Sequence, residues 1–379
     1  MYTRKIMIFG VTLLLSSCGI YTNYQSQTSV PDNLYGEEVI ASDTVSIGSI
    51  NWRDFFTDPC LQELIEKGLK QNTDVKTAEL RVEEAKASLL SAKLAFLPSF
   101  ALSPQGNISS VEGQVSRTYT LPVTASWEID IFGKLRNSKR QAKAAYMQSE
   151  DYKQAVYSSL IANIANTYYT LLMLDEQLEI SKATAETWKE TVESTQALMD
   201  AGQADEAAVS QMKATYYEVE NSVIDLEEQI NQVENSLVLL LADTPHTIQR
   251  GELENQQLPK HFSVGIPVYL LSNRPDVRAA EHALESAFYA TNQARSAFYP
   301  SITLSGSAGW TNSAGAVITN PGKFLASAVG SLTQPLFARG QLLGQLKITK
   351  AQQEEARLSF EQALLNAGTE VNDALVQYH

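Results

Sequence analysis

Residues 72–103 read NTDVKTAELRVEEAKASLLSAKLAFLPSFALS, and residues 274–305 read RPDVRAAEHALESAFYATNQARSAFYPSITLS. A shift of 202 positions (274 minus 72) aligns the two segments without a gap and places Pro98 on Pro300. Solenoid repeats have periods of only about 20–50 residues, so this spacing is far too long for a solenoid. We infer that one large unit was duplicated, and we expect internal pseudo-symmetry in the fold.

The N-terminal residues predict the cellular location of the protein. Arg4 and Lys5 precede an apolar run at 6–15, which is typical of a secretory signal and too short for a permanent transmembrane helix. The segment Leu15-Ser16-Ser17-Cys18 then resembles the lipobox of bacterial lipoproteins. This resemblance implies cleavage before Cys18 and lipidation of its amine and of its thiol, as with palmitate. The alternative is an ordinary signal peptide with an incidental cysteine.

Composition excludes several classes of protein. The formal net charge is −14, and loss of Arg4 and Lys5 with residues 1–17 takes it to −16 (−14 minus 2), so a basic nucleic-acid surface is not expected. Of the two cysteines only Cys60 remains besides Cys18, which leaves no disulfide framework and predicts an inert residue at a helix start. No later segment is long and apolar enough for a transmembrane helix, so any membrane crossing would use a β-barrel.

Catalytic and metal-binding patterns are absent from the sequence. The four histidines (246, 261, 282 and 379) form no HExxH motif, no cysteine cluster accompanies them, and no G-x-S-x-G elbow occurs. We therefore expect no catalytic residue, no metal and no cofactor.

Most of the chain is predicted to be long helix. Residues 134–201 and 203–244 contain neither Gly nor Pro, and at about 1.5 Å per residue the first would extend roughly 100 Å. The second carries an apolar seam at spacings of three and four: Val209, Met212, Tyr216, Val219, Val223, Leu226, Ile230, Val233, Leu237 and Leu240. The first carries a matching stripe, interrupted at Asp175: Tyr157, Ile161, Ile164, Tyr168, Leu171 and Leu178. These patterns predict an antiparallel coiled-coil hairpin that turns at residues 200–203, with Gly202 as its left-handed C-cap.

Each repeat also predicts a shorter helix followed by two strands. The expected helices cover 60–96 and 276–298, the strands about 99–109, 118–130, 301–310 and 324–334, and the loops 110–117 and 311–322. Apolar and polar residues alternate over 301–310, as in a half-buried strand. Pro104 and Pro122 predict bulges or strand starts.

The predicted strands have the length of transmembrane strands, and their aromatic residues could form interfacial girdles: Trp127, Trp310, Tyr119 and Phe324. The alternative is a small soluble sheet. Because membrane barrels need at least about eight strands, four strands from one chain would require several protomers.

Several motifs, in order along the chain, resemble the TolC-type outer-membrane efflux factors, specifically the lipoprotein branch that works with resistance-nodulation-division pumps. They are NWRDFFTDP at 51–59, WEIDIFG at 127–133, IPV at 266–268, RPDVRAAE at 274–281, FYPS at 298–301 and PLF at 335–337. The resemblance covers essentially everything from Cys18 onward.

The resemblance implies a mainly α fold with a small β part, built as a homotrimer. Each protomer would give four strands to a twelve-stranded transmembrane β-barrel in the outer membrane and long coiled-coil helices to a periplasmic α-barrel. The implied function is passive export of substrate that an inner-membrane pump and a periplasmic adaptor deliver, without enzyme activity. The alternatives from the residues are a coiled-coil periplasmic scaffold lipoprotein without a pore and a periplasmic lipoprotein enzyme.

The expected domain order has five parts. These are a signal peptide at 1–17, an extended segment at 18–57, a first repeat at 58–245, a linker at 246–273 and an incomplete second repeat at 274–379. The sequence ends at His379 inside the expected long helix of the second repeat, so we expect either a fragment or a short form without the second tunnel hairpin.

The hairpin tip also departs from the family pattern. Ala207-Ala208-Val209 stands where a polar residue and Asp usually precede Val. The remaining candidates for a periplasmic gate are the nearby Asp200, Gly202, Asp205 and Glu206. The alternative for these residues is ordinary helix-end chemistry, since acidic side chains suit a helix N-terminus.

Overall fold

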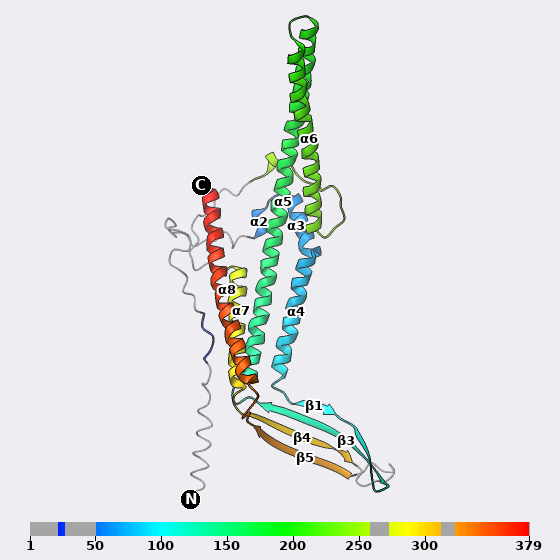
Figure 1. The fold of residues 1–379 in the computed structure, drawn as a ribbon, viewed down its shortest axis with the longest axis vertical. Coiled ribbons are helices and arrows are strands. Elements are labelled where there is room, and N and C mark those ends of the chain that lie inside the picture. The colour runs from blue at the N-terminus through cyan, green and yellow to red at the C-terminus, as the bar shows by residue number, and fades with distance from the viewer. Residues whose placement is uncertain (1–21, 27–50, 258–272, 312–322, 379) are drawn as a thin grey trace. The chain divides into compact units, whose positions relative to one another are not determined.

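The structure is a computed structural model and describes residues 22–26, 51–257, 273–311 and 323–378 (Figure 1). Cys18, the expected signal peptide, most of the expected linker and all but Thr311 of the loop expected at 311–322 lie outside these residues; Thr311 is the last residue of β4 (Ser301–Thr311). The helices are α2 (Trp52–Phe55), α3 (Pro59–Gln71), α4 (Thr73–Leu94), α5 (Lys134–Asp200), α6 (Glu206–Leu240), the 3-10 helix η2 (Leu253–Asn255), α7 (Pro275–Ser296) and α8 (Gln341–Tyr378). The strands are β1 (Ser99–Leu102), β2 (Gln105–Val111), β3 (Gln114–Ile129), β4 (Ser301–Thr311) and β5 (Lys323–Thr333).

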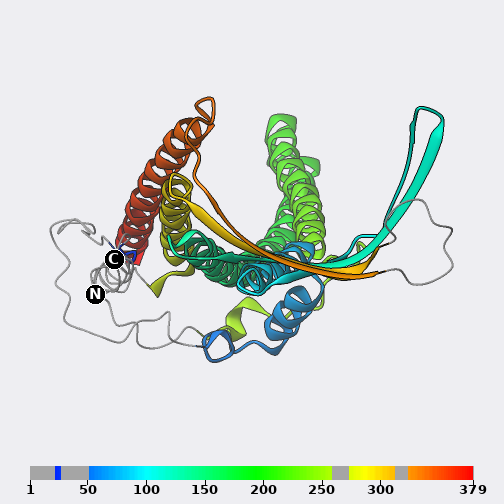
Figure 2. The same ribbon diagram turned by 90° about the horizontal axis from the view of Figure 1, so that it is seen from below.

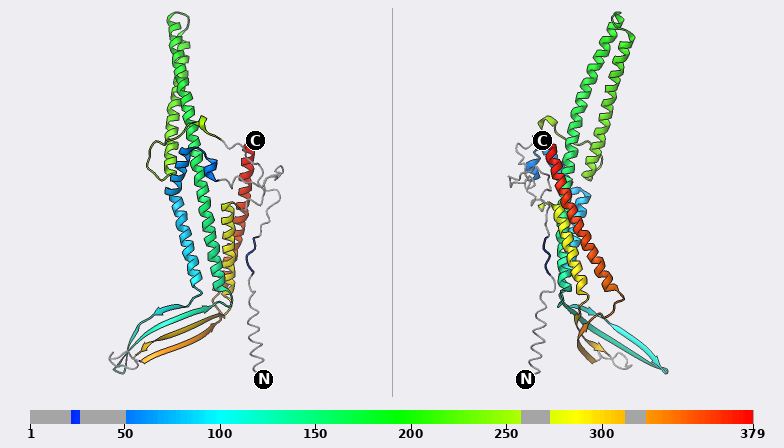
Figure 3. Two further views of the ribbon diagram at one scale, coloured as in Figure 1. Left: turned by 180° about the vertical axis from the view of Figure 1, so that it is seen from behind. Right: turned by 60° about the vertical axis from the view of Figure 1, so that its left-hand side comes forward.

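The described residues fall into two compact units. The first takes its residues from 1–36, 81–151 and 271–379, and holds the sheet, α7 and α8. The second takes its residues from 37–80 and 152–270, and holds α2, α3 and the α5–α6 hairpin. Figure 3 shows α7 and α8 side by side in both of its views.

The duplication is visible in the element bounds. Adding 202 to the bounds of α4 gives those of α7, and the same shift moves the first residue of β1, Ser99, onto that of β4, Ser301. Both helices therefore lead into a strand at the same distance from their start, as the repeated sequence predicts.

The prediction of a single helix at 60–96 is wrong, because the chain breaks at Asn72 and forms two helices, α3 and α4. Asn72 takes an extended conformation (ψ 137°), which no helix residue can have. Its side-chain oxygen accepts hydrogen bonds from the backbone N–H groups of Asp74 (2.8 Å) and Val75 (3.1 Å) and so caps α4. Its amide donates to the Leu240 carbonyl at 2.9 Å, which ties this break to the end of α6.

The expected coiled-coil hairpin is confirmed. Every residue of the α6 seam is buried or half-buried, and Figure 1 shows α5 and α6 as an antiparallel pair. The stripe of α5 meets this seam in one core, in which Ile164, Tyr168, Leu171 and Leu237 are fully buried. No helix in the described ranges combines the length and the apolarity needed to cross a membrane.

The strands form one antiparallel sheet in the order β1-β3-β4-β5, with β2 beside β1 on the same edge of β3 (Figure 2). The expected strand at 99–109 is interrupted at Ser103-Pro104, because proline cannot donate to the ladder. The sheet is therefore four strands wide, with two strands from each repeat.

The prediction of a loop at 110–117 is wrong. Val111 pairs with Gln114, so the connection is a two-residue turn made by Glu112 (φ 51°) and Gly113 (φ 81°). Positive φ at both central residues matches the right-handed strand twist, which is why such turns close tight hairpins. The ladder of β2 and β3 consequently continues through the residues expected to form the loop.

Pro122 and Gly309 face each other where the two repeats meet in the sheet. A Cβ atom on Gly309 would lie 2.6 Å from Pro122 Cα and would also clash with the Leu121 carbonyl oxygen. Gly306, on the same strand, would place its Cβ 3.5 Å from the nearest atom, which is ordinary contact. The neighbouring β3 residues therefore leave room for a side chain at Gly306 but not at Gly309.

We expect Gly309→Ala to lower the free energy of unfolding of the sheet by about 1–3 kcal/mol, because β3 and β4 must separate to admit the methyl group. Gly306→Ala is the matched control and should change it by much less. Unfolding of the purified protein, with Trp52 and Trp188 replaced by Phe so that the fluorescence comes from Trp127 and Trp310 of the sheet, measures both. Equal stability of the two variants would contradict the close approach at Gly309.

Candidate functional site

One face of the sheet is apolar throughout its central part. Because side chains alternate along each strand, the pairing register assigns each residue to a face. The apolar face carries Phe100, Leu102, Leu121, Val123, Ala125, Trp127, Ile129, Ile302, Leu304, Ala308, Trp310, Phe324, Ala326, Ala328 and Leu332. Most of its large side chains are exposed, and Phe100 and Leu332 keep 71% and 67% of their surface accessible, while Ile129 and Ile302 are half-buried. An apolar patch of this extent marks a surface made to be covered.

The opposite face of the sheet carries mostly hydroxyl groups. Its serines and threonines are Ser99, Thr120, Thr124, Ser126, Ser301, Thr303, Ser305, Ser307, Thr311, Ser327, Ser331 and Thr333. Several bond across or along the sheet, as Ser307 does with the Ser327 hydroxyl at 2.7 Å. Among the described residues of this face, the ionic ones are Lys323, opposite Thr311 at the end of the ladder, and Glu128, which pairs with Lys134 at 2.9 Å. This face is therefore polar and almost uncharged.

Aromatic side chains stand at both ends of the apolar face. Trp310 and Phe324 lie directly opposite each other and pack edge to face, with centroids 5.7 Å apart. Trp127 lies opposite Leu304, six positions from Trp310 along β4, which at about 3.4 Å per residue separates the two aromatic levels by roughly 20 Å. Apolar bands of outer-membrane proteins are about 25 Å tall and carry aromatic girdles at both edges.

Side chains from the returning strands fix the helix-to-strand junctions. The Trp127 indole donates a hydrogen bond to the Phe96 carbonyl at 2.9 Å. In the second repeat the Gln334 amide donates to the Phe298 carbonyl at 3.0 Å. Since Phe96 and Phe298 correspond under the 202-residue shift (298 minus 96), both repeats satisfy the same carbonyl with different donors.

The structure brings the four candidate tip residues together in one turn between α5 and α6. Gly202 has φ 74°, its N–H donates to the Met199 carbonyl, and the Gln203 N–H donates to that of Leu198, which is a Schellman motif. Asp200 ends α5 and accepts a hydrogen bond from Gln196 at 3.1 Å. Asp205 caps α6 through the Ala208 N–H at 2.8 Å, and Glu206 begins that helix.

All four tip residues are exposed, so the turn presents three carboxylates to solvent beside one left-handed glycine. Helix-end chemistry accounts for the conformation of Gly202 and for the cap made by Asp205. The hydrogen bond from Gln196 to Asp200 and the place of Glu206 in the first turn of α6 are likewise ordinary helix-end chemistry, yet all three carboxylates keep their charge at the tip.

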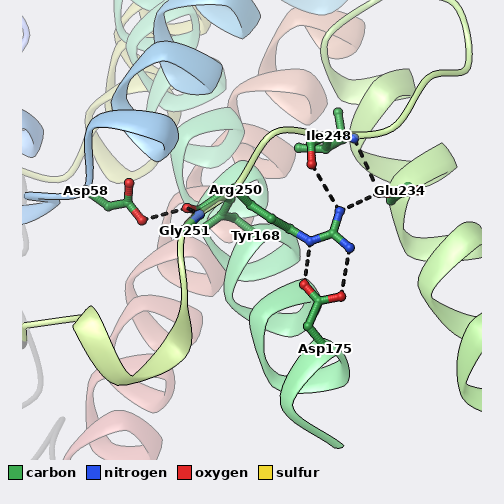
Figure 4. A network of polar contacts seen from close by, with 7 residues as sticks. All are labelled: Asp58, Tyr168, Asp175, Glu234, Ile248, Arg250 and Gly251. Atoms are coloured by element: carbon green, nitrogen blue, oxygen red, sulfur yellow. Dashed lines mark hydrogen bonds and ion pairs between the residues drawn. The ribbon is translucent and has the colours of Figure 1, made fainter. Parts of the chain in front are cut away.

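A partly buried ion cluster at the base of the hairpin is the feature that the sequence did not predict. Arg250, from the segment after α6, places its guanidinium between Asp175 of α5 and Glu234 of α6 (Figure 4). It also donates to the Ile248 carbonyl at 3.1 Å, and Glu234 accepts from the Ile248 N–H. The hydrogen bond with Asp175, and then that with Glu234, raises the pKa of Arg250 further above its ordinary value, so its charge is permanent.

A second network lies beside this cluster and is centred on the fully buried Tyr168. Its hydroxyl donates to Asp58 at 2.6 Å and accepts from the Gly251 N–H at 3.0 Å. Asp58 also caps α3 through the Cys60 N–H and accepts from Gln256 at 2.8 Å. Burial alone would raise the pKa of Asp58, but the hydrogen bonds from Tyr168, Gln256 and the α3 backbone hold it below its ordinary value.

The interruption of the α5 stripe at Asp175 was the one sequence signal for these networks. An acidic residue on a buried helix face needs a partner, yet nothing in the sequence pointed to Arg250, which is 75 residues away. Across the described ranges, no three His, Cys, Asp or Glu residues are grouped so that they could hold a metal ion. Cys60 is free and half-buried, and burial raises the pKa of its thiol.

Long antiparallel helices joined to a small two-faced sheet are the architecture of helical outer-membrane channels. A solved structure of the outer-membrane channel OprN superimposes with a TM-score of 0.83 at 26% identity, over 94% of this chain and 82% of that one. The cation efflux system protein CusC of Escherichia coli O6:H1 is 26% identical over 98% of this chain and 82% of its own length. The probable outer membrane lipoprotein SilC of Salmonella typhimurium is 25% identical over 99% of this chain and 83% of its own.

The model of the outer membrane efflux protein family matches residues 64–243 and 266–379, which is more than half of the 379 residues. The chain therefore belongs to the outer membrane efflux protein family. The family resemblance seen in the sequence is confirmed, and the family is one of transport channels rather than of enzymes.

We expect Arg250→Met to lower the free energy of unfolding by about 3–5 kcal/mol, because Glu234, only 9% exposed, would keep a buried charge without its partner. Lys182→Met is the matched control, since it breaks the exposed Lys182–Glu227 pair that joins the same two helices and should cost at most about 1 kcal/mol. Urea unfolding followed by circular dichroism compares them. Similar losses in both variants would show that the cluster contributes no more than a surface pair.

The Asp58 carboxylate should make the free energy of unfolding depend on pH in the acid range. Because its folded pKa lies below the ordinary 3.8, its contribution is present above that value and is lost as the pH falls through the folded pKa. Tyr168→Phe should cost about 1–3 kcal/mol at neutral pH and should flatten the decline of stability below pH 3.8. Tyr169→Phe is the control, since that hydroxyl makes no hydrogen bond within the part of the chain that the structure describes. An unchanged acid profile in Tyr168→Phe would contradict the proposed linkage.

Proposed function

We propose that the chain is one subunit of a homotrimeric duct through which substrates cross the outer membrane passively. The observation that carries this proposal is the sheet with one apolar and one hydroxyl-bearing face. In water the exposed apolar face would be costly: nine large side chains at about half exposure and about 2 kcal/mol each sum to roughly 10 kcal/mol. That is comparable to the whole stability of a typical domain, about 5–15 kcal/mol. Contact with lipid removes this cost.

The hydroxyl face would line the path of the substrate. Serine and threonine hydroxyls hydrogen-bond water, so this face can remain hydrated while the other contacts lipid. The outer edges of the four-strand sheet are β1 with β2 on one side and β5 on the other. Unpaired strand edges cannot stand in lipid, and pairing with the edges of two further copies would close the sheet.

The N-terminus would anchor the subunit. The relative SilC is named a probable outer membrane lipoprotein, and the lipobox-like segment ending at Cys18 favours the same modification in this chain. The helices would extend the duct on the periplasmic side toward an adaptor and an inner-membrane pump. CusC is named a component of a cation efflux system, which supports such an assembly. The five-part domain order expected from the sequence stays our prediction.

We propose that the carboxylates of Asp200, Asp205 and Glu206 act electrostatically at the periplasmic mouth. Three carboxylates on each of three copies would concentrate cations there, since a mouth lined by one sign of charge raises the local concentration of counter-ions. Gly202 would keep the turn tight enough to hold these charges at the tip.

The test is conductance of the purified full chain in planar lipid bilayers. We expect discrete steps that favour cations, and we expect the triple variant Asp200→Asn, Asp205→Asn, Glu206→Gln to lose this preference. Asn is as good an N-cap as Asp, so the triple variant should keep its stability, whereas Asp205→Ala should cost about 1 kcal/mol.

Absence of any conductance from a correctly folded trimer would overturn the duct. A coiled-coil scaffold without a pore predicts that outcome, together with protease cleavage within residues 99–130 and 301–334. Unchanged ion selectivity in the triple variant would overturn the role of the tip alone.

A further inference from the structure

A cavity of about 470 Å³ lies between the N-terminal segment 22–26 and the helices α7 and α8. It belongs to neither the two-faced sheet nor the hairpin tip. Its walls are Thr22 to Gln25 on one side, Leu284, Phe288 and Arg295 of α7 on the second, and Lys350, Gln353, Glu354 and Arg357 of α8 on the third.

Specific contacts build these walls. The Tyr24 ring packs edge to face on Phe288 with centroids 5.7 Å apart, and the Tyr24 N–H donates to the Tyr289 hydroxyl at 3.4 Å. The buried Thr291 hydroxyl donates to the Thr349 carbonyl at 3.0 Å and fixes α7 against α8. The cavity therefore has a defined frame and an apolar side formed by Leu284, Phe288 and Tyr24.

The residues that line the cavity carry a net positive charge. Three cations and one carboxylate line it, which leaves a net charge of +2 (+3 minus 1). Outside this lining, the Glu281 and Glu285 carboxylates lie near enough to Tyr24 to add to the effect of burial in raising its pKa. Arg357 already forms ion pairs with Glu354 and Glu361. Arg295 donates to the neutral Asn292 side chain at 3.2 Å, and neither Arg295 nor Lys350 has a carboxylate partner among the described residues. These two cations have donors to offer to an anionic ligand.

The two cations stand at the end of the cavity nearest the sheet. Arg295 is one residue before the end of α7, and β4 begins at Ser301. Lys350 follows Thr349, which contacts Thr291 one helical turn from Arg295. Leu284 lies eleven residues farther along α7 (295 minus 284), about 16 Å away at 1.5 Å per residue, so the apolar wall extends away from the cations.

Two observations place the cavity beside the membrane if the sheet spans the outer membrane as proposed. The inference rests on that proposed function. With the sheet in lipid, the sheet end of α7 lies at the level of the headgroups. Thr22 also lies only four residues after Cys18 (22 minus 18), a reach of at most about 14 Å from the lipidated residue.

We propose that this cavity binds the phosphate headgroup of an anionic phospholipid from the periplasmic leaflet of the outer membrane. Arg295 and Lys350 would bind the phosphate oxygens, since charge-assisted hydrogen bonds from these side chains suit phosphate. Leu284, Phe288 and Tyr24 would contact the apolar part of the lipid. Binding would hold the N-terminal segment against α7 and α8.

The test uses the full chain, purified in detergent, stripped of lipid and observed by native mass spectrometry. Phosphatidylglycerol, which is anionic, is added in parallel with phosphatidylcholine, which is zwitterionic. We expect one tightly held phosphatidylglycerol per protomer and about tenfold weaker retention in the double variant Arg295→Gln, Lys350→Gln, equivalent to about 1.4 kcal/mol. Lys347→Gln, an exposed cation of α8 outside the cavity, is the matched control and should bind like the unchanged chain.

Equal retention of both lipids, or equal retention in the double variant, would overturn the site. Inorganic phosphate and glycerophosphoglycerol, which lacks acyl chains, distinguish the source of the phosphate. Displacement of the lipid by either at equal concentration would mean a site for free phosphate and would overturn lipid binding. Conductance is recorded on the same double variant, where we expect no change. Failure of the duct would appear as missing conductance in the unchanged chain, separately from the lipid result.

Discussion

The pairing register of β3 with β4 is the constraint on which the rest of the sheet depends, because it is the seam between the two repeats. Side chains alternate with a period of two, so a slip by one residue would mix apolar and hydroxyl-bearing side chains on both faces. Pro122 opposite Gly309 opposes such a slip. A slip by one residue would put Ala308 or Trp310 in that place and bring a Cβ atom against the β3 backbone. One proline and one glycine thus protect the difference between the two faces.

The second unit solves a different problem, which is to hold α2, α3, the α5–α6 hairpin and an irregular segment in one packed base. Burial of apolar side chains supplies most of the free energy that holds these helices together. The polar networks around Arg250 and Tyr168 fix where the helices and the segment after α6 lie against one another. Arg250 bonds to both helices of the hairpin, while Tyr168 joins the start of α3 to the segment after α6. Asn72 adds a third link, between the α3–α4 break and the end of α6. Each link joins residues far apart in sequence, so the base depends on side chains that no local pattern specifies.

The elements that were predicted from sequence are those whose signal is periodic. The α6 seam, the matching stripe of α5, the repeated helix and the alternating strand at 301–310 all follow from side-chain spacing, and the structure has them close to the expected bounds. The break at Asn72 was missed because asparagine only weakly disfavours helix interiors, and its capping role depends on the Leu240 carbonyl of another helix. The turn at Glu112-Gly113 was missed because Glu-Gly is a weaker turn signal than Asn-Gly or Asp-Gly. The place of the candidate tip residues in one turn was predictable because they flank a glycine between two long helices. Arg250 was not found, because long-range pairing of charges leaves no periodic trace.

The Schellman turn at Gly202 has a consequence for how such proteins diversify. The turn is self-contained: its hydrogen bonds in the described structure join residues 196–203, and the α6 cap joins Asp205 to Ala208. Below it, the seam repeats every seven residues, so a heptad added to both helices preserves every packing layer. Each such addition moves the tip by about 10 Å without changing the base or the sheet. The hairpin is thus a modular spacer, whose length evolution can adjust in discrete steps to the distance that a partner requires.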